Sequence, residues 1–91
     1  MLPKKDYKLV KIVKSRSKNK KYTAFLENRE TGDMEKIHFG DSRYQQYKDK
    51  IGDYAHLDHG DKKRRQNYIK RHRVNSFEPY SANYFSLKYL W

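Results

Sequence analysis

Seven lysine and arginine residues lie within the thirteen residues from Asp61 to Arg73. Their ammonium and guanidinium groups bind phosphate and carboxylate oxygens, and guanidinium can do so through two parallel hydrogen bonds. Such a run either contacts a polyanion or forms a solvated face that keeps a small protein soluble. We expect an anionic partner, and assign its contacts in this run to Lys62, Lys63, Arg64, Lys70, Arg71 and Arg73.

The same run has the pattern of an ordered helix and not of a disordered basic tail. The carboxylate of Asp61 can accept hydrogen bonds from the first free N–H groups of a helix. The sequence therefore predicts a helix over about 61–73, with one side that docks on the rest of the domain. The residues that share this side are Arg65, Tyr68, Ile69 and His72.

A second group of cations lies near the N-terminus, around a polar loop at residues 15–19. Lysines in the flanking strands have an ordinary explanation, because charged side chains on edge strands prevent aggregation. The loop itself is the better contact candidate, since a basic hairpin loop can enter a nucleic-acid groove. We therefore add Arg16 and Lys18 to the expected partner contacts.

The charge of the chain is large and unevenly distributed. The formal net charge is +11, and positive segments at residues 1–27 and 61–91 flank a slightly acidic middle at residues 28–60. A chain of this kind binds polyanions at low salt whether or not that is its biological role. Charge alone does not distinguish nucleic acid from an acidic protein surface.

Other kinds of site have weak support in the sequence. His56 and His59, with Asp58 between them, could supply metal ligands, but a structural zinc site takes four ligands and the chain has no Cys. Hydrogen-bonded loop histidines are the simpler interpretation. A glycine-rich phosphate loop and a nucleophile elbow are both absent from the sequence. We expect no enzyme, no metal or other cofactor and no small-molecule substrate.

The elements that must position these residues follow from hydrophobic periodicity. Strands are predicted at about 7–14, 20–27 and 34–39, and the short connections between them favour an antiparallel meander. Helices are predicted at about 42–51, 61–73 and 81–90. Strands followed by helices are typical of an α+β fold, and 91 residues make one domain, 1–91. We expect the helices to cover one face of the sheet.

Two of the predicted helices depend on particular residues. In the first, Tyr44, Tyr47 and Ile51 would form the apolar side, after a strand break at Gly40 and before a C-terminal cap at Gly52. In the last, Ser81 would cap the N-terminus, and the aromatic C-terminal end would complete the core or insert into a partner. The candidate interface anchors are Tyr84, Tyr89 and Trp91.

The order of several motifs resembles that of a family of small basic proteins from large DNA viruses. The motifs are Lys-Ile-His-Phe-Gly at 36–40, Tyr-Ile-Lys-Arg-His at 68–72 and a terminal Leu-Trp at 90–91. Similar small proteins occur in crAss-like tailed bacteriophages, and the resemblance covers about residues 20–91. It implies a viral origin and a virion-associated role, and it transfers no catalytic residue.

These observations together predict a minor or auxiliary capsid protein that binds major capsid subunits or another virion protein and contacts packaged DNA. The alternative is a small basic nucleic-acid-binding protein, packaged or regulatory. We expect no membrane association, because no apolar run approaches the roughly 18 residues of a membrane span. Residues 1–5 lack the apolar segment of a signal peptide, so we expect the host cytoplasm before assembly and the virion afterwards.

Overall fold

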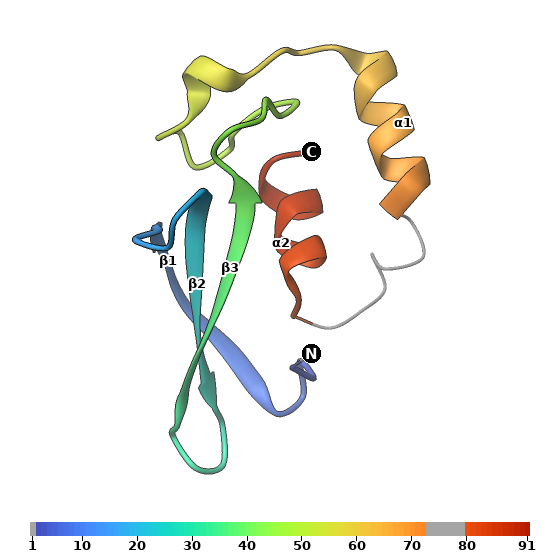
Figure 1. The fold of residues 1–91 in the computed structure, drawn as a ribbon. Coiled ribbons are helices and arrows are strands. Elements are labelled where there is room, and N and C mark those ends of the chain that lie inside the picture. Colours follow the sequence, from blue (N-terminus) through green and yellow to red (C-terminus); the bar gives the residue numbers. More distant parts are fainter. Residues whose placement is uncertain (1, 73–79) are drawn as a thin grey trace.

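The structure is a computed structural model that describes residues 2–72 and 80–91. Within these residues it contains a three-stranded antiparallel sheet in the order β1-β2-β3, followed by helices (Figure 1). The α+β fold with an N-terminal meander is therefore confirmed. The elements are β1 (Tyr7–Lys14), β2 (Lys20–Asn28), β3 (Met34–Asp41), the 3-10 helix η1 (Ala55–Leu57), α1 (Lys62–His72) and α2 (Ala82–Tyr89).

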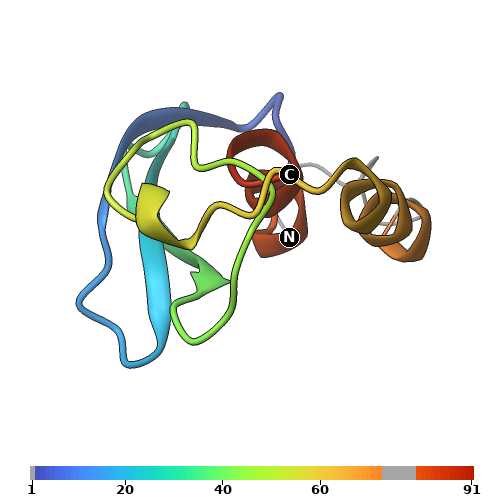
Figure 2. The same ribbon diagram turned by 90° about the horizontal axis from the view of Figure 1, so that it is seen from above.

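The helices lie in two successive layers on one side of the sheet. Seen from above, α2 stands between the sheet and α1, and the chain between β3 and α1 passes over one end of this stack (Figure 2). Helix α2 packs on β3. The expectation that the helices cover one face of the sheet is thus confirmed for α2 and wrong for α1, which lies outside α2.

Successive side chains of β2 point alternately to the core side of the sheet and to its opposite face. Tyr22, Ala24 and Leu26 are fully buried, whereas Phe25 on the opposite face is only partly covered. In β1 the register shifts between Leu9 and Lys11. This bulge lets Leu9 pair with Leu26 and Ile12 pair with Ala24, so both β1 side chains keep to the core side.

The core is small and rich in aromatic rings. Phe39 of β3 stacks on Phe85 of α2 with ring centroids 5.4 Å apart, and Tyr22 lies 5.7 Å from Phe39. At the N-terminal end, the N–H of Leu2 donates to the carbonyl of Tyr80 at 3.2 Å. The first residues are thereby tied to the start of α2.

Strand β3 continues through Gly40 to Asp41, so the predicted break at Gly40 is wrong. Gly40 has φ +76°, a conformation that favours glycine. A Cβ atom at this position would lie 2.8 Å from Cδ1 of Leu90 and 3.1 Å from Cβ of Lys21. Glycine is therefore needed here because the end of α2 approaches the backbone closely.

The predicted helix over 42–51 does not form; this segment consists of turns and isolated bridges. Its expected apolar side is not buried, since Tyr44 is 65% exposed and Ile51 is 37% exposed. The buried side chains are instead Gln46 and Asp49, at 0% and 5% exposure. Their polar atoms are satisfied by tertiary hydrogen bonds, and these override the local helical pattern.

The other two helices begin where the capping residues predict. The Asp61 carboxylate accepts from the N–H groups of Lys63 at 2.9 Å and Arg64 at 3.2 Å. The Ser81 hydroxyl accepts from the N–H of Tyr84 at 3.0 Å. In the part of the chain that the structure describes, no helix is long and apolar enough to cross a membrane.

Candidate anion-binding groove

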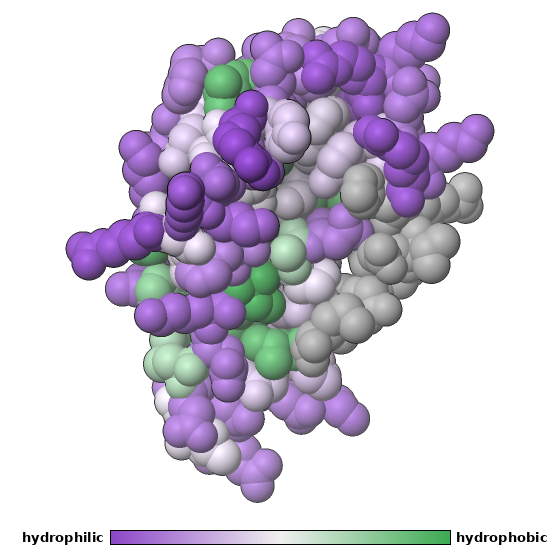
Figure 3. Space-filling view, in the orientation of Figure 1, coloured by the Kyte–Doolittle hydropathy of each residue, from purple (hydrophilic) through white to green (hydrophobic). Residues whose placement is uncertain are grey.

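A groove with a volume of about 1080 Å³ lies between α1 on one side and α2 with the end of β3 on the other. We call it the basic groove. Figure 3 shows that hydrophilic residues cover most of the visible face of the molecule. The polar and aromatic residues that line the groove include Lys20, Arg64, Lys70, Arg71, Tyr44, Gln45, Asn67, Tyr68, Asn83 and Trp91.

One wall of the groove exists because Trp91 holds α1 in place. The ring of Tyr68 stacks on that of Trp91 with centroids 4.0 Å apart and an interplanar angle of 3°. The Nε–H of Arg65 donates to the Trp91 carbonyl at 2.7 Å, and its guanidinium lies 5.1 Å from the ring of Tyr47. Arg65 and Tyr68 therefore dock α1, as expected. Ile69 is partly buried, and the side chain of His72 lies outside the described part of the chain.

The structure divides the predicted contact residues of α1 into two groups. All five that are described are exposed, but only Arg64, Lys70 and Arg71 line the basic groove. Arg64 also donates to Oε1 of Gln45 at 3.0 Å, a contact that links the two walls. Lys62 and Lys63 are not among the lining residues, and Arg73 lies outside the described residues.

The predicted loop contacts lie apart from this site. Arg16 and Lys18 are exposed in the β1–β2 connection and do not line the basic groove. The cation that β2 contributes is Lys20, which sequence reasoning did not select. Tyr44, Gln45, Asn67 and Asn83 were also missed. Their spacing gives no signal, because they meet only after α1 docks and the segment after β3 takes its irregular path.

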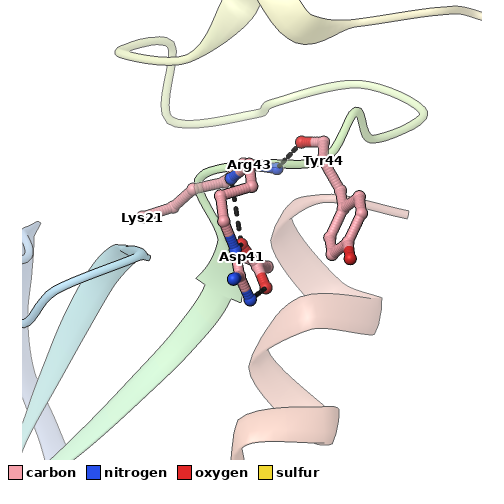
Figure 4. Close-up of polar contacts among 4 residues, drawn as sticks. All are labelled: Lys21, Asp41, Arg43 and Tyr44. Atoms are coloured by element: carbon pink, nitrogen blue, oxygen red, sulfur yellow. Dashed lines mark hydrogen bonds and ion pairs between the residues drawn. The ribbon is translucent and has the colours of Figure 1, made fainter.

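The carboxylate of Asp41 in the groove wall is paired with a neighbouring arginine (Figure 4). Nε and Nη2 of Arg43 donate to its two oxygens at 3.0 Å and 2.8 Å. These hydrogen bonds, above all from the Arg43 side chain, lower the pKa of Asp41 to about 2. Arg43 offsets this negative charge, so the groove keeps its positive character.

Lys21 has a structural role and is not a free cation of the groove. Its side chain is 2% exposed, and its Nζ donates to the carbonyl of Tyr44 at 2.9 Å and to Oε1 of Gln46 at 2.5 Å. Burial lowers the pKa of Lys21, while the charge of Asp49 opposes this shift. Figure 4 shows the ring of Tyr44 pointing away from Lys21. Lys21 thus fixes the backbone that presents the Tyr44 ring.

A network of buried polar groups, which we call the Asp49 network, fixes the segment after β3. Asp49 accepts from the hydroxyl of Tyr22 at 2.5 Å and from the N–H of Tyr54 at 2.8 Å. Gln46 donates to the Tyr54 carbonyl at 2.8 Å and to Oδ1 of Asp58 at 2.5 Å. Asp58 also accepts from the N–H of Asp49 at 2.7 Å. These hydrogen bonds fix the segment that carries Tyr44 and the residues that lead from it to α1.

The three candidate interface anchors take part in the chain's own aromatic cluster. Tyr84 contacts Phe85 edge-on at 5.2 Å, and Tyr89 lies 6.3 Å from Phe85. Trp91 lies under Tyr68, as described above. These contacts agree with the alternative that the C-terminal end completes the core. A contact of the same rings with a partner stays a prediction.

His59 is a structural residue of the segment before α1. Its Nδ1 accepts from the N–H of Asp61 at 2.9 Å, and its ring lies 5.2 Å from that of Trp91. Burial, with the nearby charge of Arg64, lowers the pKa of His59. Among the described residues, no group of three or more His, Asp or Glu side chains could hold a metal ion.

Comparison with known proteins gives a family and no activity. Neither the search of curated proteins nor the search of solved structures returned a match. Residues 10–72, more than half of the chain, match a family of unknown function, DUF5754. The matched segment begins within β1 and ends with α1, so it includes the Asp49 network and the basic helix. On this match, the chain belongs to the DUF5754 family.

Proposed function

We propose that this protein is a non-enzymatic nucleic-acid-binding protein that holds the phosphate backbone in the basic groove. The observation that carries the proposal is the convergence of cations from two distant parts of the sequence. Lys20 comes from β2, and Arg64, Lys70 and Arg71 come from α1. Cations grouped in this way bind phosphates and gain free energy from the release of counterions.

The neutral residues of the groove favour nucleic acid over an acidic protein surface. Asn67, Asn83 and Gln45 lie beside the cations, and side-chain amides are frequent donors to phosphate and sugar oxygens. Tyr44 presents a ring that is 65% exposed at the same site. A ring among cations suits a ligand that has both phosphates and flat bases. The proposed recognition is largely independent of base sequence.

The proposal is tested by two charge reversals on the same helix. Lys70→Glu with Arg71→Glu removes two groove cations, whereas Lys62→Glu with Lys63→Glu makes the same charge change outside the groove. Fluorescence anisotropy with a labelled 20-base-pair duplex should show strong loss of affinity for the first variant only. The titration is run near physiological salt, where screening over about 8 Å limits long-range effects. Equal losses in the two variants would reject the groove as the site.

The second candidate function is the auxiliary capsid component that the sequence predicts. It is supported by apolar side chains exposed on the sheet, since Val10 and Met34 are each 48% exposed and Val13 is 37% exposed. A protein partner could cover them. Under this candidate the protein occurs in purified particles of its virus at a copy number close to that of major capsid subunits. Quantitative mass spectrometry that finds only traces would reject it.

A further inference from the structure

The face of the sheet that points away from the helices carries an aromatic ring between two lysines. The register places Phe25 of β2 beside Lys11 of β1 and beside Lys36 of β3. Both helices lie on the other side of the sheet (Figure 2). This open face is therefore separate from the basic groove.

The two lysines converge on the ring from opposite sides. Nζ of Lys11 lies 5.0 Å from the centroid of Phe25, and Nζ of Lys36 lies 5.6 Å from it. Both lysines are exposed and the ring is partly exposed. The neighbouring cation Lys8 is 3.2 Å from the carboxylate of Glu27, so the charge of that carboxylate is offset.

We propose that this open face is a second nucleic-acid site, which binds a single strand. Phe25 stacks on an unpaired base, while Lys11 and Lys36 contact the phosphates on either side of it. An aromatic ring on an open sheet, flanked by flexible cations, suits a base and its backbone together. The bases of a duplex have no free face for such a ring, so this site prefers single strands.

This inference deepens the proposed function, because it also assumes a nucleic-acid ligand. The two sites face different directions, so one molecule can hold a duplex in the basic groove and a single strand on the sheet. If the cation–π contacts of Lys11 and Lys36 served only to stabilise the sheet, their loss would leave single-strand affinity unchanged. The experiment below distinguishes the two roles.

The first test measures affinity for a labelled oligothymidylate and for a duplex in parallel. Phe25→Leu keeps an apolar side chain on the sheet but removes the ring, and it should weaken single-strand binding at least about fivefold. Lys11→Gln with Lys36→Gln should weaken it as well. Both variants should keep duplex affinity and a wild-type circular dichroism spectrum. Unchanged single-strand affinity in both variants would overturn the inference.

The second test locates the contact directly. An oligonucleotide that contains 5-iodouracil is photo-crosslinked to the wild-type protein, which is then digested with trypsin. The adduct should appear on the peptide of residues 22–29, in which Phe25 is partly exposed on the open face and Tyr22 is fully buried. Adducts confined to α1 would overturn this site and leave the groove standing. Wild-type protein that binds the single strand but not the duplex would count against the groove and leave the sheet site standing.

Discussion

Tyr22→Phe tests the Asp49 network by removing a single oxygen atom. The hydroxyl of Tyr22 donates to Asp49 at 2.5 Å and accepts from the N–H of Asp53 at 3.0 Å. The side chain is fully buried, so water does not replace these bonds without a rearrangement. Phenylalanine keeps the ring and its contacts with Phe39 and Tyr54.

The magnitude follows from the two bonds that are lost. A hydrogen bond to a charged group contributes about 1.5–3 kcal/mol, and a neutral one about 1 kcal/mol. We therefore expect Tyr22→Phe to lower the free energy of unfolding by about 2–4 kcal/mol at pH 7. The matched control is Tyr44→Phe, whose ring is 65% exposed and whose effect should stay below about 0.5 kcal/mol.

The loss of stability at low pH is a second measurable effect, and its direction follows from the pKa of Asp49. Burial raises the pKa of Asp49, but the hydrogen bond from Tyr22 and bonds from backbone N–H groups outweigh it, so this pKa is lowered. A lowered folded-state pKa gives stability that is present above the unfolded value of about 4. That stability is lost as the pH falls through the folded-state pKa. Without the Tyr22 hydroxyl, the acid-dependent loss should be smaller.

Urea unfolding followed by circular dichroism at pH 7 and pH 3 measures both effects. The wild type should lose more stability than Tyr22→Phe between the two pH values. The reasoning would be refuted if the free energy of unfolding of Tyr22→Phe lay within about 0.5 kcal/mol of the wild-type value at pH 7. Surface substitutions without a structural effect vary by about this amount.

Three further predictions concern the groove and the close approach at Gly40. Trp91→Ala removes the ring under Tyr68, so hydrogen exchange in α1 should accelerate more than in the sheet; equal acceleration throughout would show that Trp91 is simply a core residue. Because Trp91 is the one tryptophan in the sequence and lines the groove, duplex binding should change its fluorescence, and an unchanged spectrum at saturation would place the duplex elsewhere. Gly40→Ala should cost about 2–4 kcal/mol in urea unfolding, because strain at positive φ adds to overpacking. Gly32→Ala is its control, since φ is +78° there but the nearest atom lies 4.0 Å away; equal costs would contradict the role of Leu90.

The sheet was predictable because its side chains obey a local rule. Tyr22, Ala24 and Leu26 alternate with Thr23 and Phe25, and this period of two indicates a strand that directs the first three side chains to one face. The helix caps Asp61 and Ser81 were predictable for the same reason, because each accepts hydrogen bonds from residues two or three positions later in the sequence. In contrast, the segment after β3 is held by bonds to residues far away in the sequence, such as that between Asp49 and Tyr22. The pattern of Tyr44, Tyr47 and Ile51 could not reveal these bonds.

The site was predictable only in part, for the same reason. The density of cations in α1 indicated Arg64, Lys70 and Arg71, since charge on an exposed helix face needs no tertiary partner to be recognised. The sequence could not separate them from Lys62 and Lys63. That separation depends on which side of α1 faces the core, and the stacking of Tyr68 on Trp91 decides it.

The central claim is that the cations of the basic groove hold the phosphate backbone. The most direct measurement is the salt dependence of duplex affinity for the wild type and for Lys70→Gln with Arg71→Gln. Each neutralised phosphate contributes about −0.9 to the slope of log K against log salt, so four cations give about −3.6 and two give about −1.8. The account therefore predicts that the slope is about −3.6 for the wild type and about −1.8 for the variant. An identical slope in the two proteins would contradict it.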